Sequence, residues 1–269
     1  MKKTEKQWFE NEEFWMRFAP VMFDGSRWAE APVVAEHIVK IARLEKGNTV
    51  LDAGCGPGRI TISLAALGMD VTGVDIIQSE LNAAQESADD EGLHITLVKK
   101  DLRYFKPQHR FDCAVNLFTS FGYCSTIKED FSILKNIARA VKKGGTFILE
   151  TTCRETAILY FTEGEDFERN GLNVKTHFYV EGAWEGLCSN WTVTDEKGNS
   201  YTHEFVQRLY SATELRTMML KAGFKTVEIC GDFDGAPYNQ HARTAVLIAR
   251  KQKILQFCSR YRPYPQQFP

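Results

Sequence analysis

The stretch Val50-Leu51-Asp52-Ala53-Gly54-Cys55-Gly56-Pro57-Gly58-Arg59 decides the fold of this chain. An apolar strand ends there in an acidic residue and then turns through glycines into a helix. Gly54 and Gly56 permit backbone dihedral angles and a close ligand approach that a Cβ atom would forbid. The helix that begins near Arg59 points its free backbone amides toward a bound group. The pattern predicts a nucleotide-type pocket at the edge of an open parallel sheet.

A second acidic residue follows at the spacing typical of such a unit. Asp75 ends the next apolar strand, Val71 to Val74, where nucleotide-binding units place an acid that binds ribose hydroxyls. The glycine run alone would also fit an ordinary strand–helix turn. The two features together favour a cofactor loop.

The composition is typical of one large globular domain. The 269 residues are 43% hydrophobic, which is enough for a sizeable core. A formal charge of −2 gives no global basic field, so nucleic acid is not expected as a partner. The seven cysteines are scattered without a C-x-x-C pair, which disfavours a disulfide framework or a zinc cluster. With no apolar run of membrane-spanning length, we expect a soluble cytoplasmic protein.

Strand and helix patterns alternate through the first half of the chain. Strands are predicted at 49–52, 71–75, 95–98, 111–117 and 146–150, with helices at 28–44, 59–67, 78–91 and 128–141. The last of these helices should end at Lys142-Lys143-Gly144-Gly145, because a basic last turn and a glycine are typical of a helix C-terminus. Such alternation predicts parallel strands with right-handed crossovers.

The pattern changes after Glu150. Residues 172–210 alternate aromatic and polar side chains between glycine turns, which predicts inserted antiparallel hairpins. A helix at 212–222 and two strands, at 226–229 and 244–249, complete the chain, and the strands should form a hairpin that leaves one edge strand antiparallel. The fold class is therefore α/β: a doubly wound, Rossmann-like sheet of seven mostly parallel strands with an antiparallel last strand, plus an inserted antiparallel β lid.

Four parts of the chain are expected on this basis. They are an N-terminal helical cap at 1–46, a Rossmann-like core at 47–151 and 212–250, an inserted β-hairpin substrate region at 152–211, and a C-terminal tail at 251–269.

The glycine loop also indicates which cofactor it binds. A nicotinamide-binding fingerprint requires G-x-G-x-x-G after an apolar strand end. This chain has Arg59 in place of the third glycine, and Asp52 precedes the loop. An acid at that point would repel a pyrophosphate and attract an ammonium group. The loop therefore favours a nucleoside with an amino-acid tail and no phosphate.

Over residues 30–151 and 212–250, including the closing antiparallel hairpin, the chain resembles the class I S-adenosylmethionine-dependent methyltransferases. The resemblance implies that S-adenosylmethionine is the methyl donor and S-adenosylhomocysteine the product. It implies that Asp75 binds both ribose hydroxyls and that Asp101-Leu102 meets the adenine amino group. Other residues placed around the cofactor are Asp52, Gly54, Cys55, Gly56, Ile76, Asn116 and Leu117, with Trp15 and Phe23 of the N-terminal segment as lid residues.

Several of these assignments have a structural alternative. Asp101 could cap a short helical turn, and Asn116 could bind loop amides. Phe14 and Phe18 share one helix face and are expected to pack in the core rather than in the lid.

The methyl acceptor should lie where the fourth strand ends and beside the inserted hairpins. Positioning can supply most of the catalysis of methyl transfer, so a strong acid or base is optional. We nevertheless place two residues in catalytic roles, His203 as a general base and Tyr123 as an orienting residue, with a surface histidine as the alternative for His203. The predicted substrate contacts are Phe118, Tyr123, Arg208 and Tyr210.

The leading hypothesis is an enzyme that methylates nitrogen or oxygen of a small metabolite, as a monomer or homodimer. Asn116-Leu117-Phe118-Thr119 lacks the Pro-Pro-aromatic signature of adenine and glutamine methylases, and no magnesium-type acidic cluster is present, so no metal is expected. Three alternatives stay open: methylation of a protein or tRNA, a non-catalytic cofactor-binding module, and a nicotinamide oxidoreductase. Asp52 and Arg59 disfavour the last.

Overall fold

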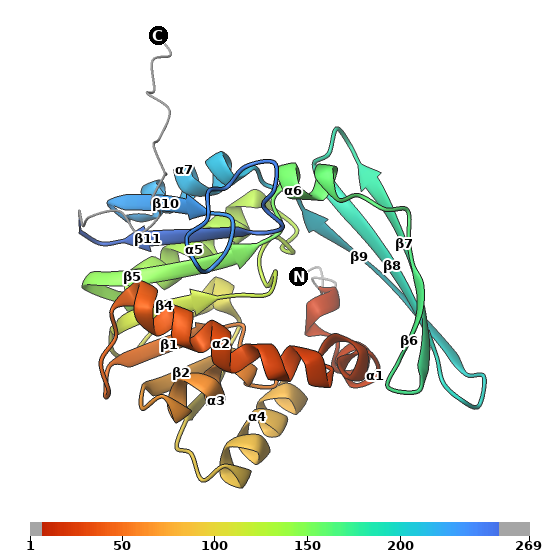
Figure 1. The fold of residues 1–269 in the computed structure, drawn as a ribbon, viewed down its shortest axis with the longest axis horizontal. Coiled ribbons are helices and arrows are strands. Elements are labelled where there is room, and N and C mark those ends of the chain that lie inside the picture. Colours follow the sequence, from red (N-terminus) through yellow and green to blue (C-terminus); the bar gives the residue numbers. More distant parts are fainter. Residues whose placement is uncertain (1–6, 253–269) are drawn as a thin grey trace, which may run out of the picture.

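The computed structural model describes residues 7–252, and it contains two sheets with helices packed around them (Figure 1). The larger sheet has seven strands in the order β10-β11-β5-β4-β1-β2-β3, and the smaller has four in the order β6-β7-β8-β9. Residues 1–6 of the predicted cap and 253–269 of the predicted tail lie outside the described residues. Within the described part of the chain, every helix is too short or too polar to span a bilayer.

The seven-stranded sheet confirms the predicted fold class. Its strands are β1 (Thr49–Ala53), β2 (Asp70–Asp75), β3 (Thr96–Lys99), β4 (Phe111–Asn116), β5 (Val141–Thr151), β10 (Thr226–Cys230) and β11 (Ala245–Arg250). Strand β11 is antiparallel to both of its neighbours, β5 and β10. The predicted hairpin and antiparallel last strand are therefore confirmed, with β10 at the edge of the sheet and β11 between β10 and β5. All six residues of β11 are buried, as suits a strand that is flanked on both sides and covered on both faces.

Helices cover both faces of this sheet. On one face lie α2 (Gly25–Ala42), α3 (Arg59–Ala66) and α4 (Gln78–Asp90); on the other lie α5 (Ile127–Ala140), α7 (Ala212–Ala222) and the short η2 (Leu102–Tyr104). Each face buries its own apolar cluster, so the alternating sequence pattern produces a doubly wound core.

One predicted helix end is wrong. Helix α5 ends at Ala140, and Val141 is already extended, so the segment Lys142-Lys143-Gly144-Gly145 belongs to β5. The register between β4 and β5 shifts there, from Phe111↔Val141 to Cys113↔Thr146. The glycines therefore form an irregularity of the strand and do not stop the helix.

The smaller sheet is the predicted insertion. After α6 (Arg154–Leu159) the chain forms β6 (Asp166–Arg169), β7 (Leu172–Glu181), β8 (Gly186–Thr194) and β9 (Ser200–Arg208), all paired antiparallel. Figure 1 shows α1 (Glu12–Met22) between this sheet and the larger one. Phe14 and Phe18 of α1 are buried in one cluster with Val174 and Val193 of the smaller sheet, which confirms the predicted core packing of these two rings.

Candidate active site

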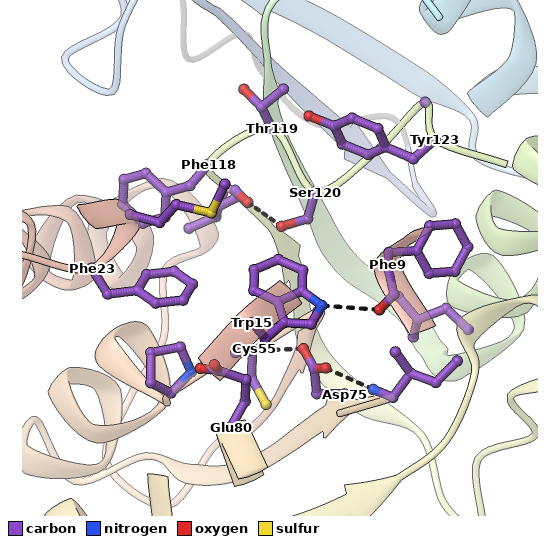
Figure 2. Close-up of a pocket in the computed structure, with 18 of the residues that line it drawn as sticks. Phe9, Trp15, Phe23, Cys55, Asp75, Glu80, Phe118, Thr119, Ser120 and Tyr123 are labelled. Atoms are coloured by element: carbon purple, nitrogen blue, oxygen red, sulfur yellow. Dashed lines mark hydrogen bonds between the residues drawn. The ribbon is translucent and has the colours of Figure 1, made fainter. Parts of the chain in front are cut away.

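A cavity of about 600 Å³ opens where β1, β2, β4 and β5 end at their carboxyl edge. In open α/β sheets this edge is where ligands bind. One end of the cavity is lined by the glycine loop and the ends of β2 and β3, and the opposite end by the smaller sheet. The N-terminal segment, with Trp8, Phe9, Trp15 and Phe23, forms a further wall (Figure 2).

The glycine loop connects β1 to α3 with three left-handed residues. Gly54, Gly56 and Gly58 have φ angles of +85°, +51° and +84°. A Cβ atom at Gly58 would lie 2.7 Å from the Cβ of Ala84 in α4, so glycine is required there for the two helices to pack. The amide of Gly54 donates to the carbonyl of Val74 (2.8 Å), which ties the loop to β2.

Asp75 lies at the end of β2 and lines the cavity, as predicted. Its Oδ2 accepts the amide of Gly56 (2.9 Å), and its Oδ1 accepts the amides of Ile76 (2.7 Å) and Ile77 (3.0 Å). Burial raises the pKa of Asp75, although the three amides act in the opposite direction. The carboxylate thus fixes the loop and also faces the cavity.

Asp52 and Cys55 complete the loop side of the cavity. Asp52 is buried and accepts a hydrogen bond from the hydroxyl of Thr61 (2.7 Å). Burial raises the pKa of Asp52 to about 6, and the nearby charge of Asp75 adds to the shift. Burial also raises the pKa of the Cys55 thiol well above its ordinary value, so this cysteine stays protonated and serves as a small wall residue.

Asp101 and Leu102 line the cavity beyond the end of β3. Asp101 is also the N-cap of η2, because it accepts the amide of Arg103 (2.8 Å), and it forms an ion pair with the Arg103 guanidinium (2.6 Å). The alternative role as a helix cap is therefore confirmed, and it is compatible with a position in the wall.

Asn116 lies behind the wall and does not line the cavity, although its neighbours Leu117 and Phe118 do. The side chain is fully buried, and its Nδ2 donates to the carbonyl of Ala53 (2.5 Å). The structure thus does not place this side chain in the cavity wall, and its contact with the cofactor stays a prediction. As the structural alternative anticipated, Asn116 supports backbone, but through a carbonyl of β1 rather than an amide.

The N-terminal segment covers the cavity. The rings of Trp15 and Phe23 both line it and lie nearly parallel, with centroids 6.2 Å apart. The Trp15 indole donates to the carbonyl of Phe9 (3.0 Å; Figure 2). Glu12 binds the N-terminus of α4, where it accepts the Gln78 amide (3.0 Å) and the Ser79 hydroxyl (2.6 Å). The placement of both rings agrees with a lid, and Glu12 links α1 to the start of α4.

The turn after β4 is strained and faces the cavity. Phe118 and Thr119 have φ angles of +53° and +59°, a region that non-glycine residues seldom occupy. Glu150 at the end of β5 holds this turn, because its carboxylate accepts the amide of Phe118 (2.7 Å) and the hydroxyl of Thr244. Strain of this kind is concentrated at functional sites.

Tyr123 follows the same turn and lines the cavity, as predicted. In Figure 2 its hydroxyl points toward Thr119 and Ser120. Within residues 7–252 no group hydrogen-bonds to that hydroxyl, and burial raises the pKa of the phenol. The smaller sheet supplies the facing wall, with Phe178, Ser189, Trp191 and Phe205. This end of the cavity is therefore aromatic with isolated polar groups.

His203 does not line the cavity. Its ring packs against Phe14 of α1, with centroids 4.6 Å apart, and against Trp8 at 6.3 Å. Its Nε2 is buried with no hydrogen-bond partner among the described residues, and burial lowers the pKa of the imidazole. The expected position in a pocket wall is therefore wrong. Side chains on one face of a strand point the same way, which is why His203 was expected in the wall. Helix α1 covers this face of β9 at His203, so the ring contacts α1 instead of the cavity.

Arg208 and Tyr210 also lie outside the cavity wall. Both bind Asp130 of α5: its Oδ2 accepts Arg208 Nη1 (2.6 Å) and the Tyr210 hydroxyl (2.8 Å). Arg208 further donates to the carbonyl of Cys124 (3.0 Å). The structure does not bring these two predicted substrate residues to the cavity, because both side chains are bound to a fully buried carboxylate, which needs such partners.

Several residues of the wall were not predicted from the sequence. The most informative are Arg59 as a side chain, Glu80 of α4, Glu150 of β5 and Arg243 before β11. Glu80 could have been found, since it precedes the buried Ala84 and Ala88 by four and eight residues on one helix face. The loop from Asp232 to Tyr238 does not line the cavity, whereas Arg243 and Thr244 do.

Comparison with known proteins identifies the family of this core. Residues 50–145 match the family model described as "Methyltransferase domain". A ubiquinone biosynthesis O-methyltransferase of Coxiella burnetii is 30% identical over 165 residues, which are 58% of this chain and 69% of that protein.

Solved structures share the fold at lower identity. An S-adenosylmethionine-dependent methyltransferase from Clostridium acetobutylicum matches with a TM-score of 0.73 at 14% identity, over 88% of this chain and 96% of that one. The amino pentose methyltransferase CalS10 of Micromonospora echinaspora, solved with S-adenosylmethionine bound, matches with a TM-score of 0.66 at 20% identity, over 93% of this chain and all of that one (100%). Taken with the glycine loop, Asp75 and the order of the strands, these similarities show that the chain belongs to the class I S-adenosylmethionine-dependent methyltransferases.

Proposed function

We propose that this methyltransferase transfers the methyl group of S-adenosylmethionine to nitrogen or oxygen of a small metabolite and releases S-adenosylhomocysteine. The observation that carries the proposal is the division of one cavity into a carboxylate-lined end at the glycine loop and an aromatic end at the smaller sheet. A cavity of about 600 Å³ is of the size that encloses small ligands.

The residues at the loop end fit the cofactor by their chemistry. Asp75 and the wall residue Asp101 offer acceptors to hydroxyl and amino groups, and Asp52 offers a negative charge to an ammonium group. The guanidinium of Arg59, which is buried and stacks over the Phe118 ring at 4.3 Å, lines the same cavity and offers a charge to a carboxylate. Trp15 and Phe23 supply ring faces, which tolerate a neighbouring cation.

The chain's own contribution to the reaction is to position the acceptor and to exclude water. The sulfonium group of the cofactor supplies an activated methyl group, so the protein needs no metal ligand or covalent nucleophile for the transfer. We assign the orientation of the acceptor to the Tyr123 hydroxyl, which has no hydrogen-bond partner among the described residues. The strained turn at Phe118 and Thr119 brings the wall toward the same point.

The acceptor is proposed as a small molecule because the aromatic end is enclosed by the smaller sheet and the N-terminal segment. We assign the inserted region 152–211 as the substrate region on the same ground. The relative from Coxiella burnetii is named for methylation in ubiquinone biosynthesis, which supports a small acceptor.

The test is a product screen with S-adenosylmethionine that carries a labelled methyl group. The purified protein is incubated with a panel of small amines, phenols and hydroxy acids, and separately with nucleosides, tRNA and peptides. We expect label on at least one small amine or hydroxyl compound, and loss of that transfer in Tyr123→Ala with cofactor binding retained. Label on tRNA or protein only would contradict the proposal, and cofactor binding without transfer would indicate a non-catalytic module.

A further inference from the structure

Glu80 is a buried acidic residue in the first turn of α4, and none of the cofactor contacts proposed at the loop end of the cavity involves it. Only 6% of the residue is exposed, yet its side chain lines the cavity. Figure 2 places it on the same side of the cavity as Cys55 and Asp75. Within residues 7–252, no donor hydrogen-bonds to its carboxyl group and no cation pairs with it.

This environment is unfavourable for an acid in the absence of a ligand. Burial raises the pKa of Glu80 to about 7, and the carboxylates of Asp75 and Glu12 add to the shift. The Cys55 thiol, which also faces this group, stays neutral. A buried polar group without a partner is costly, and an apolar side chain would pack at this helix position at no such cost. The position therefore points to a ligand group that hydrogen-bonds to the carboxyl.

The hydrogen bonds of Asp75 show which ligand group lacks a partner. A carboxylate has about four lone-pair sites. Three of those of Asp75 already accept backbone amides, from Gly56, Ile76 and Ile77. One site is left, whereas a ribose presents two adjacent hydroxyl groups, each with a proton to donate. A second carboxyl group beside Asp75 would therefore offer the diol an acceptor that does not compete with these amides.

We propose that Glu80 accepts the second ribose hydroxyl of the cofactor, so that Asp75 and Glu80 share the diol. This inference rests on the proposed function, since it requires an adenosine-type cofactor in the cavity. It adds a cofactor-binding residue from α4 to those from the glycine loop and β2. A neutral carboxyl of Glu80 still offers its carbonyl oxygen, so the contact does not require two negative charges side by side.

The experiment is a cycle that combines changes in the protein with changes in the ligand. The binding of S-adenosylhomocysteine and of its 2′-deoxy and 3′-deoxy analogues is measured by isothermal titration to wild type, Glu80→Leu and Glu80→Ala. Glu86→Gln, which removes an exposed acid from the same helix, is the matched control. We expect the two Glu80 variants to bind S-adenosylhomocysteine roughly 10-fold more weakly. With one of the two deoxy analogues, the variants and wild type should bind alike.

Each result decides one point. An equal loss of affinity for all three ligands, or no loss for any, would overturn the role of Glu80. If wild type binds none of the three ligands, the proposed function itself fails, so the two failures are distinguishable. Thermal unfolding of the variants shows that they are folded, and the alanine variant serves if leucine does not fit. Glu86→Gln should bind all three ligands like wild type.

Discussion

Among single residues, the buried acids at the loop end of the cavity make stability depend on pH. Burial raises the pKa of Asp52 to about 6 and that of Glu80 to about 7. Where the folded state holds a proton that the unfolded chain has lost, stability falls as pH rises. For Glu80 this window runs from its ordinary value of 4.5 to about 7.

Replacing Glu80 by glutamine should remove its share of that pH dependence. The free energy of unfolding of Glu80→Gln relative to wild type should increase by roughly 3 kcal/mol between pH 4 and pH 8, with most of the change between pH 4.5 and 7. Urea unfolding of both proteins at pH 4, 6 and 8 measures this. A difference that stays constant across the three pH values would show that the acid is not perturbed by its surroundings.

His203 should tolerate an apolar substitution. Its ring lies among aromatic side chains and its Nε2 lacks a partner among the described residues, so His203→Phe removes an unsatisfied atom. We expect unchanged turnover and a stability gain of roughly 1 kcal/mol, about 2–4 °C in the melting temperature. Loss of turnover with normal cofactor binding would restore a catalytic role for this histidine.

Among the elements, α1 forms part of the cavity wall and is linked to the start of α4 by Glu12. Glu12 accepts the amides of Gln78 (3.0 Å) and Ser79 (3.4 Å) at the start of α4, where the helix dipole favours a negative charge. The hydroxyl of Ser79 is the largest of the interactions that lower the pKa of Glu12, so the contact persists at neutral pH.

Glu12→Ala should therefore loosen the N-terminal segment and speed the release of S-adenosylhomocysteine severalfold. Stopped-flow measurement of the release rate tests this. Glu13→Ala is the control, because among residues 7–252 the Glu13 carboxylate pairs with Arg17 of the same helix and not with α4. Equal release rates for wild type and Glu12→Ala would show that the contact between Glu12 and α4 does not hold the N-terminal segment over the cavity.

Most elements of the core could be predicted from the sequence. Apolar runs and the glycines between them predicted the bounds of β1, α3, β2 and α4 to within one or two residues, because these signals are local. The end of α5 could not be predicted, since the bulge at Lys142-Lys143-Gly144-Gly145 depends on pairing with β4. The roles of His203, Arg208 and Tyr210 were also hidden, because the partners of their side chains, on α1 and α5, are distant in the chain.

In the molecule as a whole, Asp130 links the end of the smaller sheet to α5, which packs on the larger sheet. Its fully buried carboxylate binds Arg208 and Tyr210 at the end of the smaller sheet and the Cys124 amide in the loop after β4. Sequence patterning predicts that an inserted sheet exists, but its placement depends on such contacts between distant segments.

Asp130→Ala should destabilise the fold by roughly 3 kcal/mol, because it leaves a partly buried guanidinium without its carboxylate. Urea unfolding measures the loss, and Lys128→Ala, an exposed change on the same helix, is the control. A loss no larger than that of the control would mean that other contacts hold the smaller sheet in place.

Binding of S-adenosylmethionine at the glycine loop is tested most directly by isothermal titration of the purified protein with this compound and, in a parallel experiment, with NAD. The acid before the glycine turn and the carboxylate-lined cavity predict saturable one-site binding of S-adenosylmethionine and no detectable heat from NAD. Binding of NAD, or of neither compound, would contradict this prediction.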